Sequence, residues 1–294
     1  MSTDDIDIEH LRGWIGRERT LEDTITPRLA ASLGAILDEG VDFTEGAPAP
    51  TGIHWCLCPD IAPMSGLGPD GHPARGDFLP PVPFPRRMWA GGELRFSSEF
   101  RVGDRVTRIS RIDDVSVKHG RSGSLCFVQV SHRYETPRGL ALSERHDIVY
   151  RQMESAPGAS TAPAPQTREA ARRISVTADP ALLMRYSAAT FNGHRIHYDR
   201  DYCANVEGYP GLIVHGPLQA TLLLNLARQE NGGAYPASFA FRGVSPLFDG
   251  QSFTVNAGRG ARLELWVADA SGKTTMTATA TLSSDAGELP TVPA

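Results

Sequence analysis

The sequence predicts an α+β protein with two similar halves, each built from a curved antiparallel sheet and a helix. Three observations support this fold class. A segment rich in proline, alanine, serine and threonine, 154–168, lies near the middle of the 294-residue chain. The same order of elements (short helix, long connection, antiparallel meander) occurs on both sides of it. Only the second half contains a strongly apolar helical segment. We therefore expect an N-terminal domain, 1–153, a linker, and a C-terminal domain, 169–294.

The first half begins its repeat with a helix over 26–37, where Thr26 is a capping residue and Pro27 occupies the first helical position. The stretch "GDFLPPVPFPRRMWAGG" then holds four prolines, which exclude a continuous helix over 78–92. Alternating apolar residues predict strands within 124–135 and 140–151. The missing helix leaves space that an extended apolar ligand could occupy.

The second half repeats this order with a helix over 179–190, opened by Asp179 and a proline. A second helix, 217–230, is apolar on nearly every face and is followed by two glycines. Such a helix must be surrounded by protein, so we expect the second-half sheet to wrap around it. Strands are predicted within 261–269 and 274–284.

Composition excludes several classes of protein. A net charge of −5 argues against general nucleic-acid binding. Four scattered cysteines do not form a disulfide scaffold in a chain of this length. The acidic N-terminus resembles neither a secretory signal nor a transit peptide, and the longest apolar stretch, near 217–227, is too short to cross a membrane. We expect a cytoplasmic protein with no membrane or nucleic-acid partner.

The stretch "TFNGHRIHYD", 190–199, carries the polar groups that suggest chemistry. His194 and His197 can exchange protons near neutral pH, and the amide of Asn192 can orient a water between them. Asp199 is placed to cap a further short helix.

A third histidine precedes the apolar helix. His215 and Gly216 lie at its N-terminus, where free amides could stabilise the enolate oxygen of a thioester. The alternative is that Gly216 only makes a tight turn and His215 is a core residue. The histidines could also bind zinc, but the sequence has no His-x-x-x-His pair on one helix and no cysteine pair nearby, so we expect no metal. His54, Cys56 and Cys58 are predicted to pack on one face of a strand.

The stretch "YSAATFNGHRIHYDRDYCANVEGYPGLIVHGPLQATLLL", 186–224, resembles the MaoC-like, hotdog-fold hydratases and dehydratases of acyl thioesters. Its likeness is to the branch that includes mesaconyl-C4-CoA and itaconyl-CoA hydratases and the mitochondrial type 2 hydroxyacyl-thioester dehydratases. The segment 78–108 resembles the degenerate first half of the double-hotdog members. The resemblance therefore implies a double hotdog that keeps its central helix only in the C-terminal half.

The resemblance places the catalytic histidine of the family on His197 and its oxyanion site on the His215–Gly216 pair. The family's catalytic aspartate falls on Asn192 and its asparagine on His194, which is a departure because an amide cannot act as a general base. Either His194 takes the basic role, or Asn192 orients the water while His197 carries both proton transfers.

The resemblance implies a thioester of coenzyme A or acyl carrier protein as substrate, reversible addition of water to its double bond, and no cofactor. A dicarboxylic C4 substrate would need an arginine partner. Arg195, Arg87 (with Arg86 beside it) and Arg242 are the candidates, and they favour such a substrate over a fatty enoyl chain. Two competing hypotheses are a non-catalytic thioester-binding module and a thioesterase. One active site per chain leads us to expect a homodimer.

Overall fold

The computed structural model describes residues 6–120, 123–152, 168–259 and 262–282. Most of the predicted linker, and the residues beyond 282 that belong to the last predicted strand, lie outside this part of the chain. Within it, no helix is both long and apolar enough to span a membrane.

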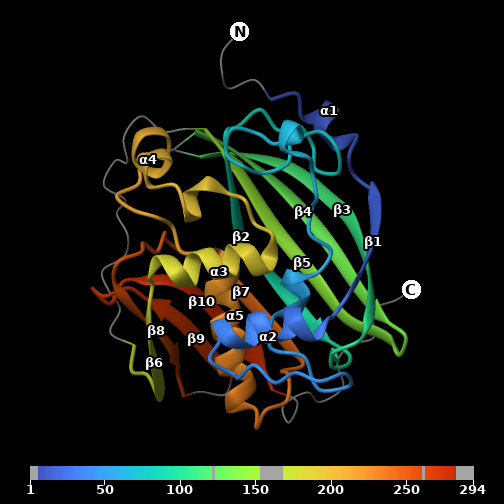
Figure 1. Cartoon of the computed structure of the whole chain (residues 1–294). Coiled ribbons are helices and arrows are strands. Elements are labelled where there is room, and N and C mark those ends of the chain that lie inside the picture. The colour runs from blue at the N-terminus through green and yellow to red at the C-terminus, as the bar shows by residue number, and fades with distance from the viewer. Residues whose placement is uncertain (1–5, 121–122, 153–167, 260–261, 283–294) are drawn as a thin grey trace.

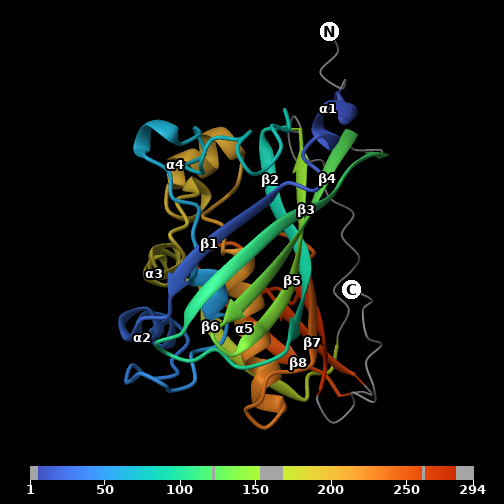
Figure 2. The same ribbon diagram turned by 90° about the vertical axis from the view of Figure 1, so that its right-hand side faces the viewer.

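The strands form one continuous antiparallel sheet in the order β1-β3-β4-β5-β2-β7-β10-β9-β8-β6 (Figures 1 and 2). Their bounds are β1 Glu18–Thr24, β2 Arg86–Phe96, β3 Arg105–Gly120, β4 Gly123–Thr136, β5 Gly139–Arg151, β6 Arg172–Thr177, β7 Ser238–Gly243, β8 Ser252–Ala257, β9 Leu263–Ala268 and β10 Thr274–Thr281.

The helices lie on one side of this sheet, as Figure 2 shows for α2, α3 and α5. Their bounds are α1 Ile8–Arg12, α2 Pro27–Ile36, α3 Pro180–Thr190, α4 Arg200–Tyr202 and α5 Gly216–Glu230, with the 3-10 turns η1 Ile53–Cys56, η2 Met64–Gly66 and η3 Arg195–His197 and the π-turn η4 Cys203–Glu207.

The double-hotdog fold class is confirmed, with one refinement. The sequence predicts one sheet in each half, but β2 of the first half pairs with β7 of the second, so the sheets join edge to edge. The register sets Gly91 opposite Arg242 and Gly92 opposite Phe241. A side chain at Gly91 would collide with the carbonyl oxygen of Phe241, and one at Gly92 with that of Arg145. Two glycines at this point therefore let the strands approach closely.

The predicted helix starts are confirmed. Thr26 Oγ1 accepts a hydrogen bond from the amide of Leu29, and Asp179 Oδ1 accepts one from the amide of Leu182. Each cap is followed by a proline at the first helical position. α2 and α3, the equivalent helices of the two halves, pack against each other.

The difference between the halves is also as predicted. α5 packs against β7, β8, β9 and β10, and most of its side chains are buried. The described residues 78–92 contain no helix: an extended segment runs through the prolines and enters β2 at Arg86. Val82 and Phe84 anchor that segment in a smaller core cluster of the first half. The volume that a second central helix would fill therefore stays open beside this segment.

One local prediction was wrong. His54, Cys56 and Cys58 do not share a strand, because residues 53–56 form a 3-10 turn. All three side chains are buried, and His54 packs among the aromatic rings of Trp55 and Phe100. Their role in packing, rather than as a ligand set, agrees with the sequence argument.

Candidate active site

A cavity of about 1470 Å³ lies between the two halves and contains most of the predicted site residues. β2 and the connection before it supply one wall, and α3, the 190–198 segment and the start of α5 supply the other. The volume exceeds that of a drug-sized pocket and suits a long, flexible ligand. Cationic side chains outnumber anionic ones in the lining: Arg19, Arg86, Arg87, Arg108, Arg151 and Lys273 against Asp60, Asp70 and Glu207.

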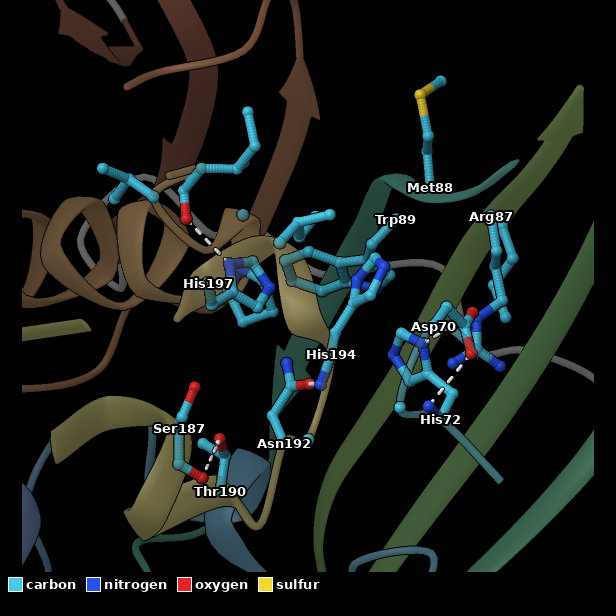
Figure 3. A pocket seen from close by; sticks show the side chains of 18 of the residues that line it. Asp70, His72, Arg87, Met88, Trp89, Ser187, Thr190, Asn192, His194 and His197 are labelled. Atoms are coloured by element: carbon cyan, nitrogen blue, oxygen red, sulfur yellow. Dashed lines mark hydrogen bonds and ion pairs between the residues drawn. The ribbon is translucent and has the colours of Figure 1, made fainter. Parts of the chain in front are cut away.

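The "FNGHRIH" segment is shaped by its own backbone. α3 ends at Thr190, and the residue that caps it, Phe191, has a φ of 51° in the left-handed region. Asn192 Oδ1 then accepts a hydrogen bond from the amide of His194 (3.0 Å), which closes a local turn (Figure 3). The side-chain oxygen of Asn192 therefore helps to fold the loop, and its amino group makes no hydrogen bond within the described structure and is available to contact a water or substrate.

His197 is held in one orientation and one tautomer. Its Nδ1 donates a hydrogen bond to the carbonyl oxygen of Ile213 (2.7 Å), so Nε2 is the basic nitrogen. Burial lowers the pKa of His197 to about 4, although the bond to Ile213 opposes this. A neutral imidazole with a fixed tautomer in the cavity wall can take a proton from water at neutral pH.

His215 lies behind His197 and does not line the cavity. The two rings stack with centroids 3.6 Å apart and planes inclined by 18°. Nε2 of His215 is 2.8 Å from Ser187 Oγ of α3, and its side chain is fully buried. Burial, with the neighbouring charges of His197 and His194, holds the pKa of His215 well below its usual value. We predicted that the side chain of His215 contacts the thioester, but this geometry does not support such a contact. From its position behind His197, the ring of His215 can instead hold the ring of His197 in place.

Gly216 is the first residue of α5 and lines the cavity. The first amides of a helix have no partner within the helix and sit at the positive end of its dipole. A Cβ at this position would lie 3.4 Å from Trp89 Cε3, an ordinary van der Waals contact, so the start of the helix lies close to β2. The helix start therefore offers a donor for a developing oxyanion.

The structure adds two residues that sequence reasoning missed, Asp70 and His72. They belong to a turn of the N-terminal half, and Figure 3 shows them facing His194. His72 Nδ1 donates to Asp70 Oδ2 (3.2 Å), and the rings of His72 and His194 have centroids 4.2 Å apart. The only signal in the sequence was an aspartate and a histidine two positions apart in "GPDGHP".

The pKa values in this cluster are all displaced. Burial would raise the pKa of Asp70, but the hydrogen bond and charge of His72 bring it well below its ordinary value. Burial lowers the pKa of His72, Asp70 opposes that, and Arg87 adds to it. Burial and the neighbouring charges of His72 and His197 hold the pKa of His194 far below its usual value. Asp70 is ionised and His194 neutral at physiological pH.

One donor atom each from Asp70, His72 and His194 lies within 4.8 Å of the other two. That spacing would also suit a divalent metal ion, and two histidines with one carboxylate are a known ligand set. This trio differs from the three histidines considered from sequence. Because Asp70 and His72 already satisfy each other by a hydrogen bond, the trio does not need an ion to be stable.

The three arginines predicted to bind substrate differ in their position relative to the cavity. Arg87, on β2, lines the cavity next to Asp70 and His72 (Figure 3). The structure does not support the substrate contact predicted for Arg195: its guanidinium pairs with Asp199 (2.7 Å), stacks over Tyr202 and donates to the carbonyl oxygen of Pro69, outside the cavity. Arg242 lies on an exposed part of β7 and does not line the cavity. Arg86 lines it, but is paired with Glu207.

Comparison with known proteins places the chain among acyl-thioester enzymes. Residues 52–249 match the family model described as hydroxyacyl-thioester dehydratase type 2. The mesaconyl-C(4)-CoA hydratase of Chloroflexus aurantiacus is 42% identical over 92% of this chain and 96% of its own length.

Solved structures share the fold at low identity. A MaoC-like dehydratase from Phytophthora capsici aligns with a TM-score of 0.68 and 14% identity, covering 95% of this chain and 99% of its own. A Mycobacterium tuberculosis protein described as a double hotdog aligns with a TM-score of 0.57 and 16% identity, covering 90% and 95%.

Proposed function

Because the chain belongs to the hydroxyacyl-thioester dehydratase type 2 family, we propose that it adds water reversibly to a C4 dicarboxylic enoyl-CoA of the mesaconyl-C4-CoA type. The chain is an acyl-CoA hydratase/dehydratase, and the proposal concerns its acyl group and the roles of its residues. The reaction as proposed needs no cofactor, and coenzyme A rather than acyl carrier protein is the carrier.

The catalytic step follows from His197 and Gly216. In the hydration direction, Nε2 of His197 takes a proton from water, and the water oxygen bonds to the β-carbon. The electron pair of the double bond moves toward the thioester, whose oxygen becomes enolate-like. The amide at Gly216 is placed to stabilise that charge. The α-carbon then takes a proton from one ring nitrogen of His194 as the other nitrogen receives one, and His197 returns its proton to solvent, which completes the addition of water.

Arg87 is the observation that favours a dicarboxylic acyl group. In mesaconyl-C4-CoA the free carboxylate is attached to the β-carbon, so it must lie next to the catalytic histidines. Arg87 lines the cavity at that place, and its charge lowers the pKa of both His72 and His194. A substrate carboxylate bound there gains a charge-assisted hydrogen bond. A fatty enoyl chain would instead leave the guanidinium facing apolar carbon.

The test is a panel of mesaconyl-C4-CoA, itaconyl-CoA and crotonyl-CoA, with turnover followed as loss of absorbance of the conjugated double bond. We expect the dicarboxylic thioesters to be preferred. Arg87→Gln should lower kcat/KM for them by about 10- to 100-fold, the value of a hydrogen bond to a charged group, and should lower it less for crotonyl-CoA, which has no carboxylate to bind. Arg242→Gln, outside the cavity, is the matched control.

A wild-type preference for crotonyl-CoA or longer chains would replace this proposal by a fatty enoyl substrate. The absence of turnover with any thioester, combined with tight binding, would support the non-catalytic binding module instead.

For the assembly, we propose a homodimer, since closed twofold symmetry is the commonest arrangement of soluble oligomers. Light scattering at micromolar concentration would test it, and a monomeric mass would contradict it.

A further inference from the structure

The turn over residues 68–73 comes from the N-terminal half but lies against the catalytic segment of the C-terminal half. The amide of Arg195 donates to the carbonyl oxygen of Asp70 (2.9 Å), and Arg195 Nη1 donates to that of Pro69 (3.1 Å). Gly71, with a φ of 86°, has no room for a side chain because a Cβ would collide with the carbonyl oxygen of Gly193. These contacts lock the two segments together.

The same turn fixes the orientation of a carboxylate and an imidazole. Asp70 Oδ1 accepts the amide of His72 (3.0 Å), while Asp70 Oδ2 accepts Nδ1–H of the same residue (3.2 Å). His72 is thereby held in the tautomer whose Nε2 is basic. Within the part of the chain that the structure describes, no hydrogen bond occupies that Nε2 or either ring nitrogen of His194.

We propose that Asp70 and His72 form a carboxylate–imidazole pair that exchanges a proton with His194 and so serves the α-carbon of the substrate. His72 and His194 carry the proton, and Asp70 is a positioning residue that holds the His72 ring and balances its charge. The inference rests on the proposed hydration reaction. Asn192 offers only an amide to this segment, whereas the turn of the first half brings a carboxylate to it.

The proton balance can be followed in the dehydration direction. His194 takes the α-hydrogen of the hydroxyacyl thioester as a proton through one ring nitrogen and releases the proton on its other nitrogen to Nε2 of His72. His72 becomes an imidazolium beside ionised Asp70. The electron pair left on the α-carbon forms the double bond, and the hydroxyl leaves the β-carbon as water with a proton from Nε2 of His197, which enters the step as an imidazolium and leaves it neutral. Solvent then carries the proton from His72 back to His197.

The hydrogen-bond partner of Nδ1 distinguishes His72 from His197 in this scheme. His72 has a carboxylate partner that stabilises its charged form, whereas His197 donates only to a neutral carbonyl group. Titratable groups whose surroundings differ in this way can be assigned opposite proton-transfer roles. A substrate carboxylate bound at Arg87 would also offset the cation that disfavours a charged His72.

Exchange of α-hydrogens tests the pair separately from hydration. The full-length enzyme is incubated in D₂O with methylsuccinyl-C4-CoA or butyryl-CoA, which have α-hydrogens but no hydroxyl to eliminate, and exchange is followed by NMR. We expect His72→Gln to slow exchange by about 10²- to 10⁴-fold, the range for a proton-transfer group. Asp70→Asn, which keeps one acceptor oxygen but loses the charge, should slow it less and leave KM unchanged. His197→Gln should retain exchange while losing hydration.

His119→Gln and Asp147→Asn, which change a histidine and an aspartate away from the cavity, are the controls and should leave exchange unchanged. Exchange by His72→Gln at the wild-type rate would overturn the proposal, as would hydration by the wild type with no exchange of either thioester. So would a stoichiometric metal ion whose removal abolishes exchange, because Asp70 and His72 would then be ligands. If the wild type exchanges butyryl-CoA but not methylsuccinyl-C4-CoA, the proposed dicarboxylic substrate is contradicted. The effect of His72→Gln on butyryl-CoA exchange then still tests the Asp70–His72 pair.

Discussion

His197 and His215 stack face to face, yet only His197 reaches the cavity. The difference comes from their hydrogen bonds: Ile213 fixes one ring with Nε2 toward the site, and Ser187 ties Nε2 of the other to α3. Two chemically identical side chains therefore differ in their access to the cavity, because one is bound to a backbone carbonyl group and the other to a hydroxyl group.

His197→Gln should lower kcat by about 10²- to 10⁴-fold, because it removes the imidazole that accepts a proton from water. Steady-state hydration and circular dichroism on the same preparation would check this. Loss of the folded state, with normal activity in what remains folded, would mean that His197 is only a core residue.

Asn192→Asp should fold normally, because a carboxylate oxygen can accept the amide of His194 as the present carbonyl-type oxygen does. Combined with His194→Asn, it gives the arrangement that the resemblance to MaoC-like hydratases implies, and the double variant should recover activity that each single change loses. Strictly additive losses in a double-mutant cycle would show that the two positions are uncoupled.

At the level of elements, the turn over 68–73 determines whether the N-terminal half can contribute to catalysis. Gly71→Ala should lower kcat, because the added methyl group would push this turn away from Gly193 and separate His72 from His194. Gly76→Ala is the control: it has a similar positive φ of 103°, but its Cβ would meet nothing closer than Pro81 at 3.7 Å. Equal losses in both variants, measured with the enoyl-CoA panel, would attribute the effect to backbone strain alone.

Sequence patterns predicted the elements well because their signals are local. Thr26, Asp179 and Asp199 cap helices as expected, since a capping residue and its amide are three positions apart. The cluster of Asp70 and His72 with His194 could not be predicted, because it joins segments more than 100 residues apart. Arg195 was assigned to the substrate because it lies within the motif, but its side chain points toward Asp199 and the turn.

For the whole molecule, buried histidines predict a loss of stability in mild acid. The pKa of His54 is lowered to about 4 by burial, as is that of His197. In the unfolded chain each would titrate near ~6.5. Between these values the unfolded state binds more protons, so stability is fully present above pH ~6.5 and falls as the pH drops toward about 4.

Thermal unfolding between about pH 7.5 and 4.5 would measure this effect. His54→Phe should reduce the slope of Tm against pH, because His54 packs among aromatic rings and its Nε2 has no hydrogen-bond partner in the described structure. A Tm that is flat across this range would contradict the burial of neutral histidines.

The pairing of β2 with β7 has a consequence for solubility. This pairing covers one edge strand of each half-sheet, so among the described strands only β1 and β6 have an unpaired side. An open edge can recruit strands from other chains, and natural proteins blunt such edges with charge. β1 carries Glu18, Arg19, Glu22 and Asp23 in seven residues, and β6 is short and begins with Arg172 and Arg173. Fusion of the halves thus leaves two charged strands at the margins of the sheet, which disfavours pairing with other chains.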